Sequence, residues 1–306
     1  MNGIQEIPLA FGPDRSLLGV LSTPARGEST PIACLMLNAG ATHRVGPGRI
    51  HVKLARQLAE RGVSSLRMDL SGFGDSGAAQ GAEHARVQAV RDLQAAMDQV
   101  ESMLGIRRFV VIGLRSGAAN ALALAVADSR VVALSMFDGF AFPSRRSLWE
   151  RRARQVLAAV GNPGLVGKTA RWLSPKAGTP SAQSAQSAHS DDCVSSDADR
   201  ALFRRSMLQL SEREIAVMLT YSGSAHVVDH DRDQLGALAH EPFMRNIDYR
   251  FLPDVGGNLT SIASQQSFMA AVTDWVLRVA SQRAPAASEP LPRRLVPVER
   301  VMLRTA

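Results

Sequence analysis

Apolar and polar positions follow two different periods along most of this chain. Residues 4–11 and 17–22 alternate with a period of two around the turn formers Gly12-Pro13-Asp14, which predicts a β-hairpin. Residues 32–37 form an unbroken apolar run, typical of a strand that is buried on both faces. Shorter runs predict further strands at residues 63–69, 109–112, 131–137, 215–221 and 249–252.

Helical periods fill the segments between these predicted strands. Apolar residues spaced three and four apart predict helices at residues 49–61 and from Val90 to Leu104, and a third helix is expected to begin at Ser116. A helical stretch is expected between the last two strands, and a final helix at residues 264–280. Strands that alternate with helices predict an α/β fold, with a mostly parallel sheet of about eight strands flanked by helices.

One long segment interrupts this alternation and suggests a division of the chain. Residues 1–140 and 212–282 are expected to form the α/β core, and residues 141–211 a cap insertion. The insertion opens with a basic helical stretch and continues into residues 177–199, whose Ser, Ala, Gln and Asp repeats predict a flexible loop. Residues 283–306 form a Pro/Arg-rich tail.

Charge and cysteine content narrow the function classes only slightly. The formal net charge of +7 is concentrated in the cap and the tail, but phosphate-loop and zinc-finger patterns are missing, which argues against a nucleic-acid partner. Two cysteines, Cys34 and Cys193, suit a reducing compartment. The first residues do not resemble a secretion signal, and no apolar run reaches the ~20 residues of a membrane span. We therefore expect a cytoplasmic location.

Three motifs stand in a fixed order between the predicted strands and helices. They are residues 35–40 followed by His43-Arg44-Val45-Gly46-Pro47, then residues 67–76 (Arg-Met-Asp-Leu-Ser-Gly-Phe-Gly-Asp-Ser), then Gly113-Leu114-Arg115-Ser116-Gly117. Together they resemble the α/β-hydrolase superfamily. More narrowly, they are similar to serine-aminopeptidase-like hydrolases found with bacterial exopolysaccharide and exosortase systems. The resemblance implies an α/β-hydrolase fold whose last motif is a nucleophile elbow.

This resemblance places Arg115 where the nucleophile is expected. A guanidinium stays protonated at working pH, so it cannot attack an acyl carbon. Ser116 follows directly, and we expect its side chain to cap the next helix. The alternative is that Ser116 is a displaced nucleophile.

The acid and base positions that the resemblance implies are also changed. The acid would follow the strand at residues 215–221, where Ala225 stands, and Asp138 and Asp229 are nearby alternatives. The base would follow the last strand, where Asn258 stands, and no histidine occurs after His240. Without an imidazole, a serine hydroxyl has no general base near neutral pH.

The same region suggests a binding site. Asn38 and Ala39 belong to the loop that would supply an oxyanion-hole amide, and His43 either shapes that loop or contacts a ligand. Arg115 beside the Ser116 amide at a helix N-terminus would attract a carboxylate or phosphate, such as an acidic sugar. Alternatively, Arg115 only fills the site and pairs with Asp69, Asp138 or a cap carboxylate.

Three functional hypotheses remain open at this point. The first is a non-hydrolytic protein whose cleft binds an anionic small molecule or a partner. The second is an active ester, thioester or amide hydrolase that uses Ser116. The third is a scaffold in polysaccharide assembly, with the basic cap or tail as the docking surface for a protein partner. Because no His, Cys or Asp cluster has typical ligand spacing, we expect no metal and no cofactor.

Overall fold

The computed structural model describes residues 3–25, 29–37, 42–79, 84–160, 195–223, 229–230 and 232–282. The tail at residues 283–306 and most of the predicted flexible loop, residues 177–194, lie outside the described residues. None of the helices in these ranges has the length and apolar content that crossing a bilayer requires.

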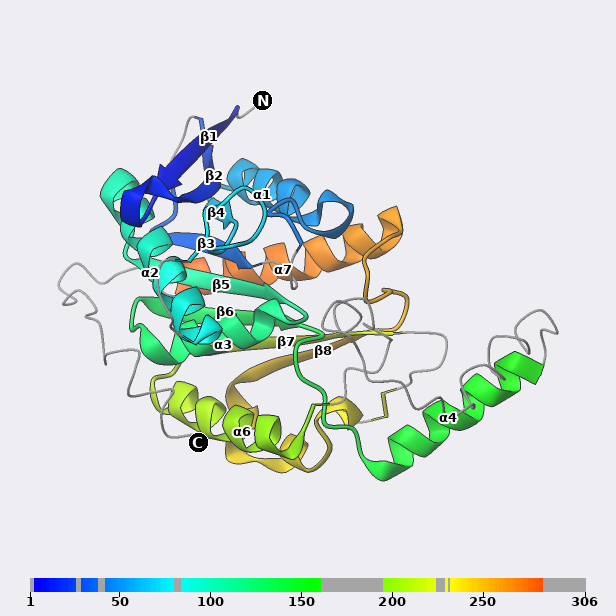
Figure 1. Cartoon of the computed structure of the whole chain (residues 1–306). Helices are drawn as coiled ribbons and strands as arrows, with labels where there is room; N and C mark the ends of the chain where they lie inside the picture. The colour runs from blue at the N-terminus through cyan, green and yellow to red at the C-terminus, as the bar shows by residue number, and fades with distance from the viewer. Residues whose placement is uncertain are drawn as a thin grey trace.

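A single twisted sheet forms the centre of the molecule (Figure 1). In spatial order its strands are β1 (Ile4–Phe11), β2 (Leu17–Pro24), β4 (Ser64–Met68), β3 (Ile32–Leu37), β5 (Arg108–Leu114), β6 (Val131–Phe137), β7 (Ala216–Ser222) and β8 (Ile247–Leu252). The β1–β2 and β2–β4 pairs are antiparallel, whereas every later pair is parallel. The predicted mostly parallel sheet of about eight strands is therefore confirmed.

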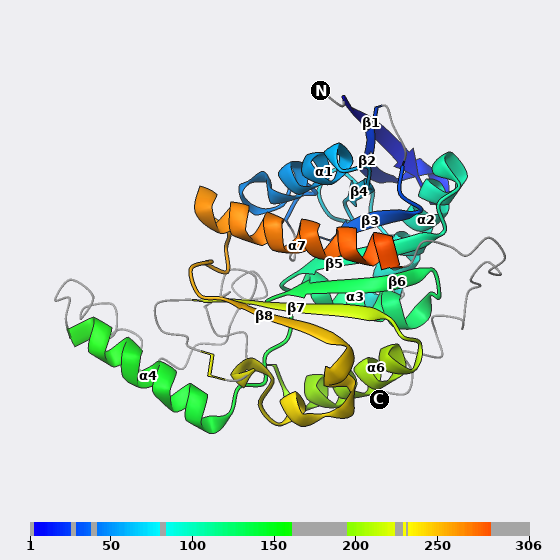
Figure 2. The ribbon, with the colours of Figure 1, turned by 180° about the vertical axis from the view of Figure 1, so that it is seen from behind.

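Helices cover both faces of this sheet (Figures 1 and 2). One face carries α1 (Ile50–Glu60) and α7 (Ile262–Gln282), and the other carries α2 (Ala85–Leu104), α3 (Gly117–Ala127) and α6 (Asp197–Glu212). Short 3-10 helices lie at Pro13–Arg15, Pro47–Arg49, Asp233–His240 and Pro242–Asn246. The apolar run of β3 alternates between the two cores: Cys34 packs with α1 and α7, and Leu35 packs with α2 and α3. This burial on both faces explains why β3 has no polar positions.

Helix α6 corrects the sequence prediction in one place. Residues 197–199 were predicted to lie in the flexible loop, but they form the first turn of α6. The Ser196 hydroxyl accepts the Asp199 amide while the Asp199 carboxylate accepts the Ser196 amide, a capping box that starts the helix. Phe203, Met207 and Leu210 are buried in the core. By its contacts α6 is thus part of the layer that covers the sheet, although the sequence places it in the insertion.

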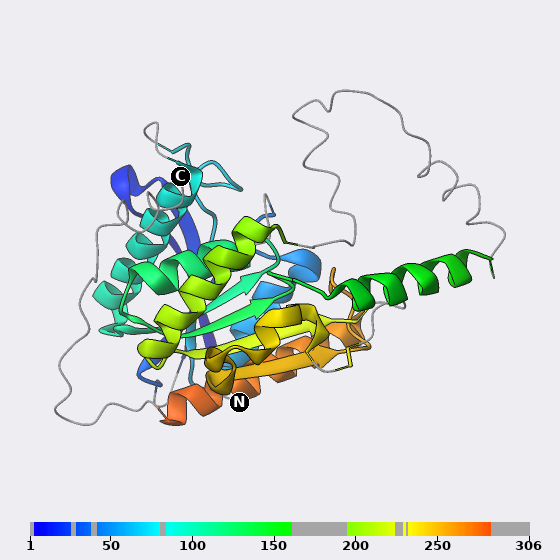
Figure 3. The ribbon, with the colours of Figure 1, turned by 90° about the horizontal axis from the view of Figure 1, so that it is seen from below.

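The other described helix of the insertion, α4 (Arg145–Val160), is arranged differently. Figures 1 and 3 show it extending away from the sheet and its covering helices. Its first half contacts the segment before β8, because Glu150 accepts a hydrogen bond from His230 at 2.9 Å. The basic helical stretch predicted at the start of the insertion is therefore present.

Candidate functional site

The carboxyl ends of four parallel strands meet at one edge of the sheet. The backbone amide of Arg115, just after β5, donates to the carbonyl oxygen of Phe137 at 2.7 Å. The backbone amide of Asp138, just after β6, donates to the carbonyl oxygen of Thr220 at 3.0 Å. Gly223, just after β7, donates to Leu252 O at 2.7 Å. Each strand end is thus held by its neighbour. In open α/β sheets, ligand sites form at this edge.

The turn from β5 into α3 has the geometry of an elbow. Arg115 adopts φ 50°, a left-handed conformation that is uncommon for a residue with a side chain. Helix α3 then packs tightly against the strand it follows, since a Cβ on Gly113 would lie 2.7 Å from the Cα of Ala118. Only glycine fits there, and the sharp turn presents Arg115 at the edge of the sheet.

The Arg115 side chain reaches the segment that follows β8. Its Nη1 donates a hydrogen bond of 2.9 Å to Oδ1 of Asn258, which is exposed. A Cβ on Gly257 would lie 3.4 Å from the same Nη1 and 3.1 Å from Oδ2 of Asp138. The structure therefore brings together three residues singled out from the sequence: Arg115, Asn258 and Asp138. None of the ion pairs among the described residues includes Arg115. Asp69, one of its expected partners, pairs with Arg44 instead.

The two alternative acids occupy different surroundings. Asp138 has φ 48°, and its carboxylate accepts the Ser222 amide at 2.8 Å and the Ser222 hydroxyl at 2.6 Å. Asp229 accepts the Asp233 amide at 2.6 Å. Burial, and then the nearby Asp229 carboxylate, raise the pKa of the Tyr249 phenol. Asp138 therefore lies at the strand-end site, whereas Asp229 faces Tyr249. Ala225 lies outside the described residues.

The expectation that Ser116 caps α3 is wrong. Ser116 already has helical angles, φ −61° and ψ −24°, and its side chain makes no capping hydrogen bond. A capping residue needs an extended backbone so that its hydroxyl can turn back to the next amides. The elbow supplies that reversal one residue earlier, at Arg115, so the Ser116 hydroxyl is exposed.

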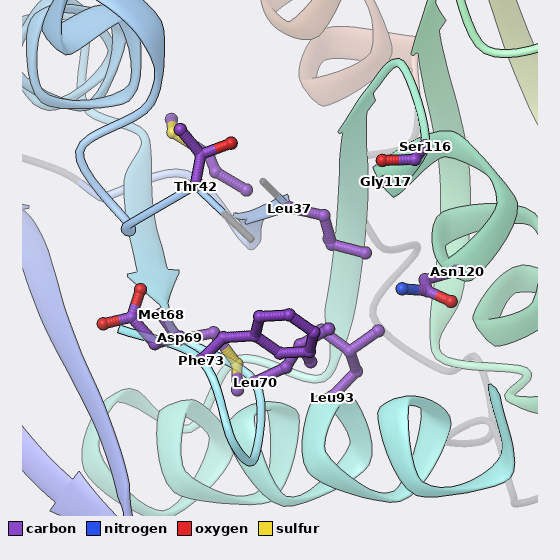
Figure 4. Close-up of a pocket in the computed structure, with 11 residues that line it drawn as sticks. Leu37, Thr42, Met68, Asp69, Leu70, Phe73, Leu93, Ser116, Gly117 and Asn120 are labelled. Atoms are coloured by element: carbon purple, nitrogen blue, oxygen red, sulfur yellow. The ribbon is translucent and has the colours of Figure 1, made fainter. Parts of the chain in front are cut away.

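A small pocket of about 160 Å³ opens beside Ser116 (Figure 4). Its wall is mostly apolar and includes Leu37, Phe73 and Leu93. The Ser116 and Thr42 hydroxyls both point into it, from the start of α3 and from the loop after β3. The pocket thus joins an apolar lining to a helix N-terminus. Asn38 and Ala39, predicted to border the same space, lie outside the described residues.

Sequence reasoning missed several residues of this site. Asn120 also lines the pocket, and it lies four residues after Ser116, which puts both on one face of α3. Phe73 belongs to the motif at residues 67–76, but its apolar role there was not predicted. Ser222 directly follows the predicted strand at residues 215–221, but its role in the site was not predicted. Helical spacing was a signal for Asn120, whereas only the folded sheet places Ser222 beside Asp138.

Within the described residues, no histidine takes part in the hydrogen bond of the Arg115 side chain. His43 contacts Asp75 with its Nε2 3.1 Å from Oδ2, so it ties the loop after β3 to the motif at residues 67–76. The hydrogen bond from His43, and then Arg44, hold the pKa of Asp75 below its ordinary value. His51 is fully buried, and this burial lowers its pKa to about 4. The interpretation of His43 as a loop-shaping residue fits its contact with Asp75.

The donor atoms of His43, Asp69 and Asp75 lie within 4.8 Å of one another, which is close enough to ligate a cation. The Arg44 guanidinium already bridges both carboxylates and lies 2.8 Å from Asp75 Oδ2. Asp69 also accepts the Arg44 backbone amide at 2.6 Å. An arginine therefore supplies the positive charge that a metal ion would bring, and the donor set does not fit a cation well.

The family model described as serine aminopeptidase, S33 (Hydrolase_4) matches residues 33–234, which is most of the sheet and its connecting segments. The chain belongs to this family of α/β-hydrolases. The expected membership of the α/β-hydrolase superfamily is therefore confirmed. No curated protein is similar enough in sequence to count as a match.

Solved structures of other members of this fold are similar over nearly their whole length. Est1E from Butyrivibrio proteoclasticus, solved with ferulic acid bound, is 15% identical with a TM-score of 0.53, covering 87% of this chain and 96% of its own. An esterase of Pyrococcus furiosus is 12% identical with a TM-score of 0.51, covering 91% and 92%. A hypothetical protein of Pseudomonas aeruginosa is 15% identical with a TM-score of 0.53, covering 90% and 94%. At sequence identities this low, the structural similarity shows a shared fold and nothing more.

Proposed function

We propose that this protein binds an anionic ligand at the elbow and does not hydrolyse it. The hydrogen bond between Arg115 and Asn258 carries the proposal. In a working hydrolase of this fold, the elbow residue and the residue after the last strand exchange a proton. Here a guanidinium meets an amide, and neither side chain can act as the nucleophile or the general base of such a pair.

The surroundings of Arg115 favour an anion. The positive end of α3 begins at Gly117, two residues after the guanidinium, and both attract negative charge. Asn258 is an uncharged partner, so its hydrogen bond brings no negative charge to Arg115. The carboxylate in the same site, Asp138, accepts hydrogen bonds from the Ser222 amide and hydroxyl. A guanidinium presents a planar fork that matches a carboxylate or a phosphate. The ligand class that fits is therefore a carboxylate or phosphate, including acidic sugars.

The neighbouring pocket adds a second requirement for the ligand. Its apolar wall reaches Ser116, the residue after Arg115, whereas Arg115 itself does not line it. A ligand held at Arg115 would have to extend past the elbow to place an apolar group there. Apolar walls favour dehydration of such a group, while the charged end fixes its orientation. A phosphate or carboxylate with a small apolar substituent satisfies both parts of the site.

The absence of an activated serine is testable with a fluorophosphonate probe. We expect no labelling of the wild-type protein, because Arg115 and Asn258 stand at the positions that the nucleophile and its imidazole base occupy in a working hydrolase of this fold. The Arg115→Ser, Asn258→His double variant restores a hydroxyl and an imidazole at contacting positions, and the Asp138 carboxylate lies beside them. We expect labelling of that variant, detected by in-gel fluorescence.

A hydrolase that uses Ser116 is the second candidate function. Its support is the exposed hydroxyl that points into the pocket instead of capping α3. Wild-type labelling that disappears in Ser116→Ala would establish this candidate and contradict the non-hydrolytic proposal. The scaffold role in polysaccharide assembly stays a hypothesis that rests on the sequence resemblance alone.

Anion binding is testable by calorimetry with phenyl phosphate, whose ring suits the apolar pocket. Removing a charge-assisted hydrogen bond costs about 1.5–3 kcal/mol, so Arg115→Ala is expected to weaken binding by about 10- to 100-fold. Arg115→Lys keeps the charge but loses the fork, and an intermediate loss is expected. Arg205→Ala, an exposed arginine on α6, serves as the matched control. Equal affinity of wild type and Arg115→Ala would rule out Arg115 as the anion site.

A further inference from the structure

Helix α4 leaves the body of the molecule near the candidate site. It starts at Arg145, shortly after β6 ends at Phe137. Ser144 accepts the Ser147 amide at 3.2 Å and begins the helix, and the contact between Glu150 and His230 holds its first half. Beyond this contact the helix extends outward, away from α6 and the sheet (Figures 1 and 3).

The free face of α4 is apolar. Trp149 is 74% exposed, Val156 is 62% exposed and Leu157 is 70% exposed. Trp149 and Val156 are seven residues apart, which places them on one stripe, and Leu157 lies beside it. By contrast, Trp275 on α7 is buried at 4% exposure because that helix covers the sheet. The described residues thus leave the apolar stripe of α4 uncovered.

Exposed arginines accompany this stripe. Arg145, Arg146 and Arg152 are exposed. The wheel of the helix places Arg145 and Arg152 at the margin next to Val156, and Arg146 between Trp149 and Leu157. Glu150 is the only acidic residue in α4, against five arginines. It contacts His230 and Arg146, and on the wheel it lies next to Leu157, at the edge of the apolar stripe. The exposed face therefore combines a tryptophan and two aliphatic side chains with a positive rim.

We propose that this face of α4 binds the surface of an anionic lipid bilayer. A helix of this kind lies in the headgroup layer, with its apolar side chains below the phosphates and its arginines among them. Tryptophan favours that boundary, because its ring is apolar and its N–H still reaches water. A nucleic acid would pair with the arginines but would leave Trp149, Val156 and Leu157 in water. The charge of the rim and the apolar stripe together match a bilayer.

Sedimentation of the full-length protein with vesicles tests this proposal. We expect binding to vesicles of equimolar phosphatidylcholine and phosphatidylglycerol, little binding to phosphatidylcholine alone, and loss of binding in high salt. Trp149→Glu should reduce binding at least tenfold. Arg145→Glu with Arg152→Glu should also reduce it by roughly tenfold or more, because each reversed charge replaces attraction with repulsion. Ile262→Glu, at a residue that is 72% exposed on α7, is the matched control.

Fluorescence adds a readout that is specific for α4. The emission difference between the wild type and Trp149→Phe isolates Trp149, and we expect it to shift to shorter wavelength when anionic vesicles are added. Because Trp149 is exposed, these variants are expected to fold, which circular dichroism checks. Unchanged sedimentation of Trp149→Glu, equal binding to neutral vesicles, or no binding to either vesicle would overturn the proposal. None of these outcomes bears on phosphate binding at Arg115.

Discussion

Gly113 determines how closely α3 approaches the sheet at the elbow. A Cβ at this position would lie 2.7 Å from the Cα and 2.9 Å from the backbone nitrogen of Ala118. Backbone atoms cannot move aside as a flexible side chain can, so the helix and the strand would have to separate. The position of Arg115, two residues further along the chain, depends on the same packing.

We therefore expect Gly113→Ala to lower the free energy of unfolding by about 1–3 kcal/mol, the usual cost of overpacking a core. Gly256 is a suitable comparison, because a Cβ there would have no neighbour within 4 Å and its φ is not positive. Urea denaturation of the two variants measures the difference. If Gly113→Ala were as stable as Gly256→Ala, the close packing of α3 on β5 would be refuted.

At the residue scale, the sequence predicted which residue occupies each position of the site better than it predicted the contacts of the side chains. The glycines at 113 and 117 were enough to place Arg115 at the turn, and its φ of 50° agrees with that placement. The contact with Asn258 joins residues 143 positions apart, and the resemblance only implied that the two lie in one site. The Ser116 prediction failed because capping preference is a local rule, whereas the elbow sets the local backbone.

At the scale of elements, the carboxyl end of α3 is held by charged side chains. Arg213, just after α6, donates to Ala125 O at 2.6 Å and to Asp128 O at 3.1 Å. Asp128 is fully buried and accepts two guanidinium hydrogen bonds from Arg130, at 3.0 and 2.9 Å. The two bonds from Arg213 satisfy backbone carbonyls, which are left unpaired at the end of every helix, and they join α3 to α6.

This network predicts a pH dependence of stability. Burial by itself raises the pKa of Asp128, but hydrogen bonds and charge from Arg130 outweigh burial and hold it below its ordinary value of 3.8. Because the pKa is lower in the folded state, the stabilisation is complete above about pH 4 and is lost as the pH falls below that value. Asp128→Asn should therefore be less stable near neutral pH.

Between about pH 4 and pH 2, the stability of Asp128→Asn should also fall less steeply with decreasing pH than that of the wild type. Thermal denaturation across this range measures the two slopes. Asp274→Asn, at an exposed position on α7, controls for removal of a carboxylate as such. Parallel curves for the wild type and Asp128→Asn would contradict the assignment of this stabilisation to Asp128.

The elements themselves were predicted well where their periods were long. The helix through Val90 and Leu104 and the final helix were found, with ends that differ by a few residues. Helix α6 was missed, although Phe203, Met207 and Leu210 have helical spacing and Ser196 stands three residues before Asp199. A low-complexity segment immediately before it concealed the start, because composition was given more weight than the capping pattern.

At the scale of the whole molecule, the alternation of strands and helices was sufficient to predict the fold class. Parallel strands need crossover helices, and the chain offers few other ways to bury so many apolar runs. The pocket beside Ser116 and the outward course of α4 could not be predicted in this way. Both depend on distances between elements, which a periodic pattern in one element does not contain.

The strand order has a consequence for how the protein is synthesised. Strands β1 to β6 come from the first 137 residues and are neighbours in the sheet, and β7 and β8 extend only one edge. During translation, six strands can pair before the insertion between β6 and β7 has left the ribosome. The insertion delays the addition of β7 and β8 at one edge of the sheet, but it does not separate strands that are already paired. The part of the insertion that precedes α6 can therefore change in length without interrupting the assembly of the part made first.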